Sequence, residues 1–258
     1  NLLGASDVNE FILQVAGLNH FIFARHIWHE GRDKLTQVIQ NISAGNDPLI
    51  PRNIPPFKWP EGLLENLGMI PCTYLRYYYM SDDMYRQELG EAQGEGTRGE
   101  VVKALEKQLF DIYRNPELAE KPKALEGRGG QYYSDAACEL MSAIYNDKRI
   151  IMHVNTRNNG AIAGLPDDCA VEVSSLITRS GPIPLNVEPF PEDTLRLIQL
   201  MKSFEALTIE AAITGDRHTA WRALVINPLI NSGQVLEKAL AEVIEHNKAL
   251  MPAFHKHP

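Results

Sequence analysis

The stretch that decides the fold is Phe11-Ile-Leu-Gln-Val-Ala-Gly-Leu-Asn-His-Phe-Ile-Phe-Ala-Arg-His-Ile-Trp28. Apolar residues alternate at positions 11, 13 and 15, which predicts a strand from Phe11 to Ala16 with one apolar face. Gly17 interrupts the pattern, and residues 21–28 are predicted to form a second strand. The chain therefore begins with β-structure.

Outside this stretch, helical patterns outnumber strand patterns. Residues 100–114 have an amphipathic pattern, and a long helix is predicted between Pro191 and Gly215. Further strands are predicted over residues 149–154 and 170–177. The predicted fold class is α+β, with helices packed on a small, mostly antiparallel sheet. Residues 81–99 and 121–130 are expected to lack regular structure.

Composition narrows the range of functions. Of the 258 residues, 44% are hydrophobic and 22% charged, which is typical of a globular protein with a substantial core. The net charge of −8 argues against nucleic acid or an anionic membrane as a partner. No apolar run approaches the roughly 20 residues of a membrane-spanning helix. Three widely spaced cysteines form neither a zinc-binding pair nor a disulfide framework, so a cytoplasmic protein is expected.

His20 is the first candidate for chemistry, because it follows Asn19 at a predicted strand end. A neutral imidazole there is a good ligand for a divalent transition metal. A lone histidine is more often structural, however, and a metal site needs about three protein ligands. The residues around His20 therefore leave both interpretations open.

Tyr133 is the second candidate, within Arg128-Gly-Gly-Gln-Tyr-Tyr-Ser134. Ser134 is predicted to cap a helix over residues 135–145, with Tyr133 just before its first turn. The positive end of a helix dipole and a bound metal both favour a tyrosinate, which lets a tyrosine act as a base. The alternative is a turn that holds a packed aromatic ring.

A third polar cluster, Asn155-Thr-Arg-Asn-Asn-Gly160, follows a predicted strand. The fork of Arg157 and the amide of Asn158 suit a phosphate or sugar hydroxyls. The alternative is a solvated turn, because Asn-Gly is a common hairpin signal.

Taken together, these stretches resemble glycoside hydrolase family 4, and most closely its 6-phospho-β-glucosidase branch. The matching segments extend over nearly the whole chain, in family order: residues 16–20, 128–134, 154–160, 165–168, 210–216 and 223–229. The resemblance implies the fold of the C-terminal substrate domain of the lactate and malate dehydrogenase-like superfamily. It also implies a substrate that is a phosphorylated disaccharide or β-glucoside.

The family is NAD-dependent and, unlike most glycosidases, does not use two carboxylates. The resemblance implies that NAD⁺ oxidises the sugar at C3, a base takes the C2 proton, the C1 substituent leaves, water adds and NADH returns the hydride. It makes Tyr133 the catalytic base and His20 a ligand of a divalent metal, most often manganese. Asn19, Arg128, Arg157 and Asn158 become candidates for substrate contacts.

The sequence also departs from the family pattern. A Rossmann domain with a glycine-rich nucleotide loop and a Cys-Asn-x-Pro metal motif precedes this region in the family, and neither motif occurs here. Residues 1–258 are therefore expected to be the substrate- and metal-binding domain alone, inactive in isolation and without a cofactor-binding residue of its own. The missing Rossmann domain and a homo-oligomer are the expected partners. They would cover apolar surface, for which the strand after His20 and the Tyr-rich segment 71–80 are the candidates.

Three other interpretations stay open. The domain could serve oligomerisation without catalysis. It could be the substrate domain of a related 2-hydroxyacid dehydrogenase, which would need no metal. It could also belong to another branch of family 4, of the α-glucosidase or α-galactosidase type.

Overall fold

The computed structural model describes residues 10–45, 57–94, 96–129, 132–230 and 232–255. The chain divides into two compact units, which are described separately below. Unit 1 comprises residues 1–156 and 172–185, and unit 2 comprises residues 157–171 and 186–258. The expectation of one substrate domain over residues 1–258 stays a prediction.

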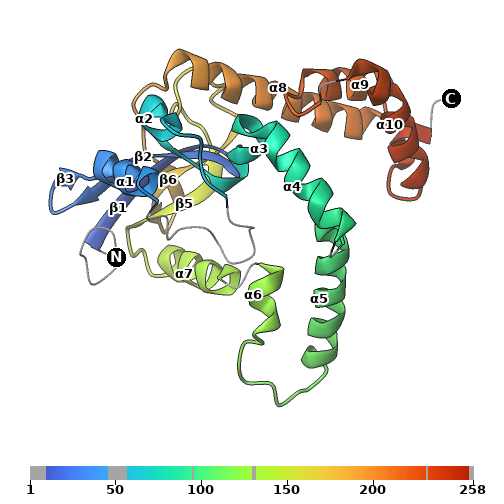
Figure 1. Cartoon of the computed structure of the whole chain (residues 1–258). Coiled ribbons are helices and arrows are strands. Elements are labelled where there is room, and N and C mark those ends of the chain that lie inside the picture. The colour runs from blue at the N-terminus through green and yellow to red at the C-terminus, as the bar shows by residue number, and fades with distance from the viewer. Residues whose placement is uncertain (1–9, 46–56, 95, 130–131, 231, 256–258) are drawn as a thin grey trace. The chain divides into compact units, whose positions relative to one another are not determined.

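Unit 1 is built on an antiparallel sheet. β1 (Phe11–Leu18) and β2 (Phe21–His29) form a hairpin, and the strand order is β3-β2-β1-β6-β5, with β4 on β2 and β7 on β6. β1 also pairs with β6, and these pairings are antiparallel. This part of the structure confirms the predicted fold class (Figure 1). The other strands span Arg32–Asp33 (β3), Ile70–Pro71 (β4), Ile150–Arg157 (β5), Ala170–Thr178 (β6) and Gly181–Pro184 (β7).

The core of unit 1 lies where the hairpin meets the helices that follow it. Val15, Ala16 and Phe23 are buried in the paired strands. α1 (Leu35–Ser43) buries its apolar stripe against Leu64 of α2 (Leu63–Leu67), and Ile27 of β2 packs on the same cluster. The 3.6-residue spacing of that stripe explains why this segment is helical.

The strand after His20 supplies only part of the exposed apolar surface that was expected. Phe21 and Phe23 of β2 are buried. In the Tyr-rich segment, Tyr74 is exposed, whereas the tyrosines at 77–79 are half-buried. For β2 the prediction is wrong at Phe21, which packs against Tyr78, and at Phe23, whereas Trp28 is 40% exposed.

Helices replace two segments that were expected to be irregular. α4 occupies Ser81–Gln93, and α6 occupies Ala124–Arg128. α4 is polar over most of its surface and buries Met84. Its apolar pattern was therefore too weak to predict a helix from the sequence. α6 packs against α5 (Arg98–Tyr113), which begins at a capping box formed by Thr97 and Glu100 (Figure 1). Short helical turns over Thr73–Leu75 and Arg76–Tyr79 (α3) precede α4.

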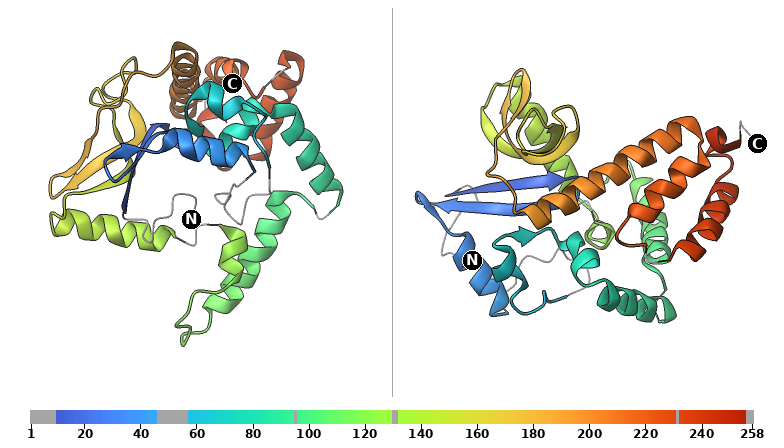
Figure 2. Two further views of the ribbon diagram at one scale, coloured as in Figure 1. Left: turned by 60° about the vertical axis from the view of Figure 1, so that its left-hand side comes forward. Right: turned by 90° about the horizontal axis from the view of Figure 1, so that it is seen from above.

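Unit 2 is helical, apart from the strand ends and the loop at residues 157–171. α8 (Glu192–Thr214) follows Pro191 and ends at Gly215, as predicted. α9 (Arg217–Ile226) and α10 (Gly233–His246) pack in sequence, and residues 252–255 return to α8 (Figure 2). The core of this bundle consists of Ala211, Ala220, Leu240, Ile244 and Phe254. In the described parts of both units, no helix is long and apolar enough to cross a membrane.

Candidate functional site

The turn between β1 and β2 presents the predicted metal ligand. Leu18 pairs with Phe21, so Asn19 and His20 form a two-residue connection, and both are exposed. Gly17 has φ of 153°, and a Cβ built on it would lie 2.1 Å from the Phe21 carbonyl oxygen. Only glycine fits there, which explains how the hairpin closes tightly around His20.

Two side chains from other elements of unit 1 meet His20. The His20 N–H donates to Oε2 of Glu172 on β6, with an N···O distance of 3.1 Å. The imidazole meets the Tyr74 ring edge-on, with centroids 5.2 Å apart. The His20 backbone has φ of 58°, in the left-handed region. The turn is therefore held from two sides in a conformation that few residues adopt.

His20 fits one ligand position of a divalent metal, since its imidazole is exposed at the tip of the hairpin. Within the described residues, however, no group of three His, Cys, Asp or Glu side chains could hold a metal ion. Burial raises the pKa of the nearby Cys72 thiol, and the Glu172 carboxylate adds to that effect. A complete metal site therefore needs ligands in addition to those that the described residues bring together.

Tyr133 lies elsewhere in unit 1, in the first turn of α7 (Tyr133–Tyr145) rather than before it. The predicted Ser134 cap was wrong: Tyr132 is the N-cap residue, and no side chain caps the helix. Because the chain already enters the helix at Tyr132, Ser134 lies too far into the first turn to cap it. The Tyr133 side chain is 72% exposed.

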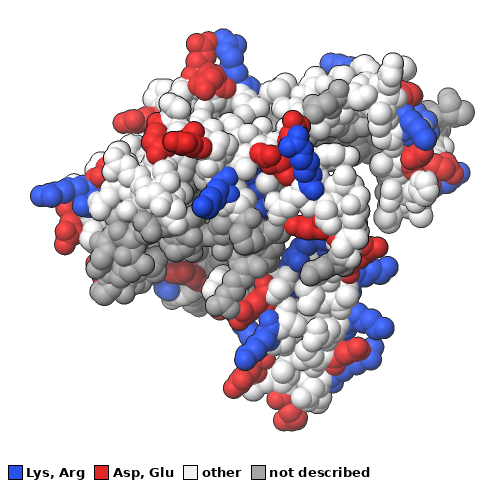
Figure 3. Space-filling view, viewed as in Figure 1, with Lys and Arg blue, Asp and Glu red and all other residues white. Residues whose placement is uncertain are grey.

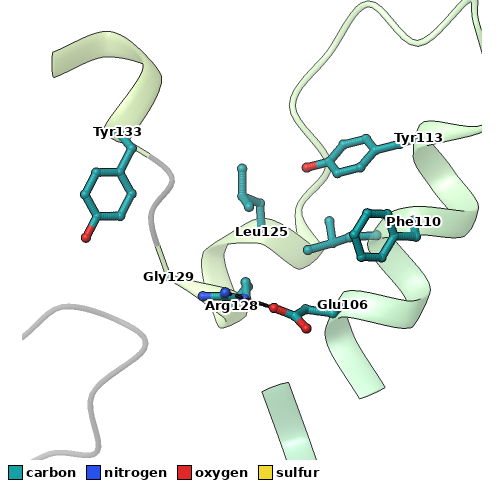
Figure 4. Close-up of a pocket in the computed structure, with 8 residues that line it drawn as sticks. Glu106, Phe110, Tyr113, Leu125, Arg128, Gly129 and Tyr133 are labelled. Carbon is teal, nitrogen blue, oxygen red and sulfur yellow. Dashed lines mark hydrogen bonds and ion pairs between the residues drawn. The ribbon is translucent and has the colours of Figure 1, made fainter. Parts of the chain in front are cut away.

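Tyr133 and Arg128 line one pocket of about 340 Å³ between α5, α6 and the start of α7. Nε and Nη2 of Arg128 bind Oε1 of Glu106 at 3.0 and 2.9 Å, so the guanidinium already has an anionic partner. The Tyr133 hydroxyl is on the far side of its ring from Leu125 and Phe110 (Figure 4). His20 does not line this pocket. The other lining residues are Leu109, Tyr113 and Gly129.

Arg157 and Asn158 have different environments at the start of unit 2. Arg157 is exposed, and its Nε is 3.4 Å from the Asp167 carbonyl oxygen. Asn158 is completely buried, and its amide donates to the carbonyls of Ile162, Leu165 and Pro166 while accepting from the Ile162 N–H. The Asn158 side chain therefore holds the loop together and has no capacity left for a sugar.

Glu172 is the residue that sequence reasoning missed. It lies 152 positions from His20, so no local motif connects the two. The available signal was a single carboxylate within the otherwise uncharged strand Ala170-Val-Glu-Val-Ser-Ser-Leu-Ile-Thr178. A charge in a strand of this kind needs a partner, and the backbone of the turn supplies it.

The charges show no single-sign surface on the face drawn in Figure 3, where Lys and Arg alternate with Asp and Glu. This distribution agrees with the net charge of −8. It lends no support to a polyanionic partner on that face, because such partners bind to continuous basic surfaces.

Comparisons with known proteins give consistent matches. The family described as "Family 4 glycosyl hydrolase C-terminal domain" matches residues 15–230. The chain is 47% identical to the "Probable 6-phospho-beta-glucosidase" of Bacillus subtilis (strain 168) over 96% of its length, and 36% identical to the 6-phospho-beta-glucosidase of Escherichia coli (strain K12) over 98%. It spans 56% and 57% of those two proteins.

The fold also matches a solved structure. The 6-phospho-beta glucosidase from Thermotoga maritima, solved with manganese, NAD⁺ and glucose-6-phosphate, superposes with a TM-score of 0.79 at 29% identity. The match covers 94% of this chain and 55% of the Thermotoga chain. The chain thus corresponds to about half of each relative.

Proposed function

The chain belongs to the C-terminal domain family of the family 4 glycosyl hydrolases, and from this we propose that it is the substrate- and metal-binding half of a 6-phospho-β-glucosidase. The observation that carries the proposal is the 47% identity, over 96% of the chain, to a protein with that name. The second such relative is 36% identical. These identities favour the β-glucosidase branch over the α-type branches. Membership of this family also speaks against the dehydrogenase alternative.

The proposed substrate is a phosphorylated β-glucoside or disaccharide. The Thermotoga structure contains glucose-6-phosphate, which supports a phosphorylated sugar as the recognised group. Asn19, Arg128 and Arg157 are the proposed contacts, and Arg157 offers an exposed guanidinium for a phosphate. Asn158 is not one of the proposed substrate contacts, because its side-chain amide already makes hydrogen bonds to the loop.

The proposed reaction divides between this chain and groups bound in the full-length protein. When bound, NAD supplies hydride uptake and return at C3 of the sugar, and a divalent metal ion such as manganese polarises the neighbouring oxygens. The carbonyl formed at C3 acidifies the C2 proton, and Tyr133 takes that proton. The electron pair left at C2 forms a C1–C2 double bond while the C1 substituent leaves with the electron pair of its bond. Water then adds its hydroxyl at C1, and Tyr133 returns a proton to C2. His20 supplies one protein ligand at the site.

The position of Tyr133 supports its role as a base. The residue is 72% exposed in the first turn of α7, where a substrate can reach its side chain.

The experiment is C2 proton exchange in the full-length protein, measured as deuterium uptake from D₂O into the sugar. We expect Tyr133→Phe to abolish exchange, because phenylalanine cannot accept the proton. Tyr132→Phe is the matched control: Tyr132 is 71% exposed at the N-cap position, and its variant should keep the parent rate. Exchange at the parent rate in Tyr133→Phe would exclude Tyr133 as the base.

Two further properties belong to this proposal. A cytoplasmic location is supported by the free thiols of Cys72, Cys138 and Cys169, which suit a reducing compartment. The exposed apolar side chains on α4, α5 and α7 support a Rossmann domain or a second copy of the protein as the covering partner. They are Tyr85, Leu89, Phe110, Tyr113, Tyr133, Met141 and Tyr145.

A further inference from the structure

The contact between Glu172 and His20 follows from the register of the sheet. Glu172 on β6 lies opposite Gly17 on β1, one residue before the end of that strand. Side chains of directly paired residues share a face of the sheet, and Gly17 contributes none. The Glu172 side chain is therefore free to extend towards the turn, where its carboxylate accepts the His20 N–H.

This hydrogen bond stabilises an unfavourable backbone conformation. The left-handed region is unfavourable for a residue other than glycine. A carboxylate that accepts a backbone N–H is a charge-assisted acceptor, which is stronger than a neutral one. The bond fixes the peptide between Asn19 and His20, and this peptide orientation sets the direction of the Cα–Cβ bond of His20.

Tyr74 restricts the orientation of the His20 imidazole ring. Its ring meets the imidazole at an interplanar angle of 77°. Glu172 holds the backbone of the turn, and Tyr74 limits how the ring rotates. The imidazole is thus exposed to solvent and yet oriented before any ligand arrives.

We propose that Glu172 is a positioning residue for His20. It holds the β1–β2 turn in the left-handed conformation and so aims the imidazole at the metal ion, without touching the metal itself. This inference rests on the proposed function, in which His20 is a metal ligand. Outer contacts that orient a ligating histidine typically change metal affinity by about 10- to 100-fold.

The experiment measures Mn²⁺ binding by the full-length protein, through the electron paramagnetic resonance signal of free Mn²⁺. Parent and His20→Ala are compared first, to establish that His20 holds the metal. We expect Glu172→Ala to weaken binding by about 10-fold or more. Glu172→Gln should stay within about 3-fold of the parent, because its amide oxygen can still accept the His20 N–H.

Two controls separate positioning from general destabilisation. Glu188→Ala removes an exposed carboxylate outside the sheet and should bind Mn²⁺ like the parent. Glu172→Asp keeps the charge but is one methylene too short to reach the turn, so it should weaken binding as alanine does. If Glu172→Ala does not fold, Mn²⁺ binding by Glu172→Asp tests the proposal in its place. In metal-free protein, the His20 amide should exchange with D₂O faster in both weakened variants.

Several results would overturn the proposal. Parent-like Mn²⁺ affinity in Glu172→Ala or Glu172→Asp would show that the contact does not aim His20. Equal weakening in Glu172→Gln and Glu172→Ala would show that the hydrogen bond is not what matters. If the parent itself binds no Mn²⁺, or binds it equally well without His20, the proposed function fails and this inference falls with it. Weakened Mn²⁺ binding in His20→Ala, Glu172→Ala and Glu172→Asp, with parent-like binding in Glu172→Gln and Glu188→Ala, supports the inference.

Discussion

Gly17 and Asn158 show how single residues determine the shape of the two loops that carry candidate residues. At Gly17, the backbone torsion and the Phe21 carbonyl both exclude a side chain. At Asn158, one buried amide makes four hydrogen bonds to the loop that follows it. Both residues lie within motifs that resemble the family, and the structure gives each a conformational role.

Gly17→Ala should destabilise unit 1 by about 3 kcal/mol or more, because its Cβ would overlap backbone atoms that cannot move without opening the hairpin. Denaturant unfolding measures the loss. Gly31→Ala is the matched control: it also has positive φ, of 73°, but nothing lies within 4 Å of the added carbon. That variant should lose only about 1 kcal/mol. Equal losses in the two variants would contradict the steric explanation.

Asn158→Ala should cost about 3 kcal/mol of stability, because it leaves buried carbonyls and the Ile162 N–H without their partner. Thermal or denaturant unfolding of unit 2 measures this. Asn155→Ala, at an exposed position on β5, should change stability by less than about 0.5 kcal/mol. A stable Asn158→Ala protein with impaired substrate binding would instead support the original hypothesis that Asn158 contacts the sugar.

At the scale of elements, the corner between β2, β3 and α1 depends on one carboxylate. Partial burial alone would raise the pKa of Asp33. The hydrogen bond with His26, the N–H groups of Leu35 and Ile27, and the His26 charge together outweigh burial and lower this pKa below 3.8. Nδ1 of His26 lies 2.6 Å from Oδ2 of Asp33.

The pH dependence of this corner follows from the sign of the shift. A lowered carboxyl pKa in the folded state stabilises the protein above the unfolded value and loses that effect as pH falls through the folded pKa. We therefore expect the parent to be more stable than Asp33→Asn near neutral pH, with the difference shrinking below about pH 4. Unfolding midpoints measured from pH 3 to pH 7 check this. A difference that stays constant across this range would contradict it.

At the scale of the whole molecule, each unit folds around its own core, and the candidate residues belong to different elements of the two units. His20 lies at the hairpin tip, Tyr133 lies at the α5–α6–α7 pocket, and Arg157 begins unit 2. The pocket lined by Tyr133 is not lined by His20. The shared cavity required by the proposed chemistry stays a prediction for the full-length protein.

The chain alone should show no steady turnover with NAD⁺, Mn²⁺ and an aryl 6-phospho-β-glucoside. The described residues bring no three metal ligands together, and the sequence has no glycine-rich dinucleotide loop. Release of the aryl alcohol, followed by absorbance, measures turnover, and the full-length protein is the positive control. Turnover proportional to the concentration of the isolated chain would contradict the assignment of NAD binding to another domain.

Local patterns in the sequence determined where several strands and helices of this protein begin and end. The alternation over residues 11–15 indicated β1, and Pro191 and Gly215 marked the limits of α8, because periodicity and backbone torsions act over a few residues. Six short motifs spread along the chain together indicated the family. The tertiary structure decided what depends on distance along the chain: the pairing of β6 with β1, and the bond from Glu172 to His20 that this pairing makes possible. Those outcomes follow from strand register and packing between residues far apart in sequence, which no local pattern encodes.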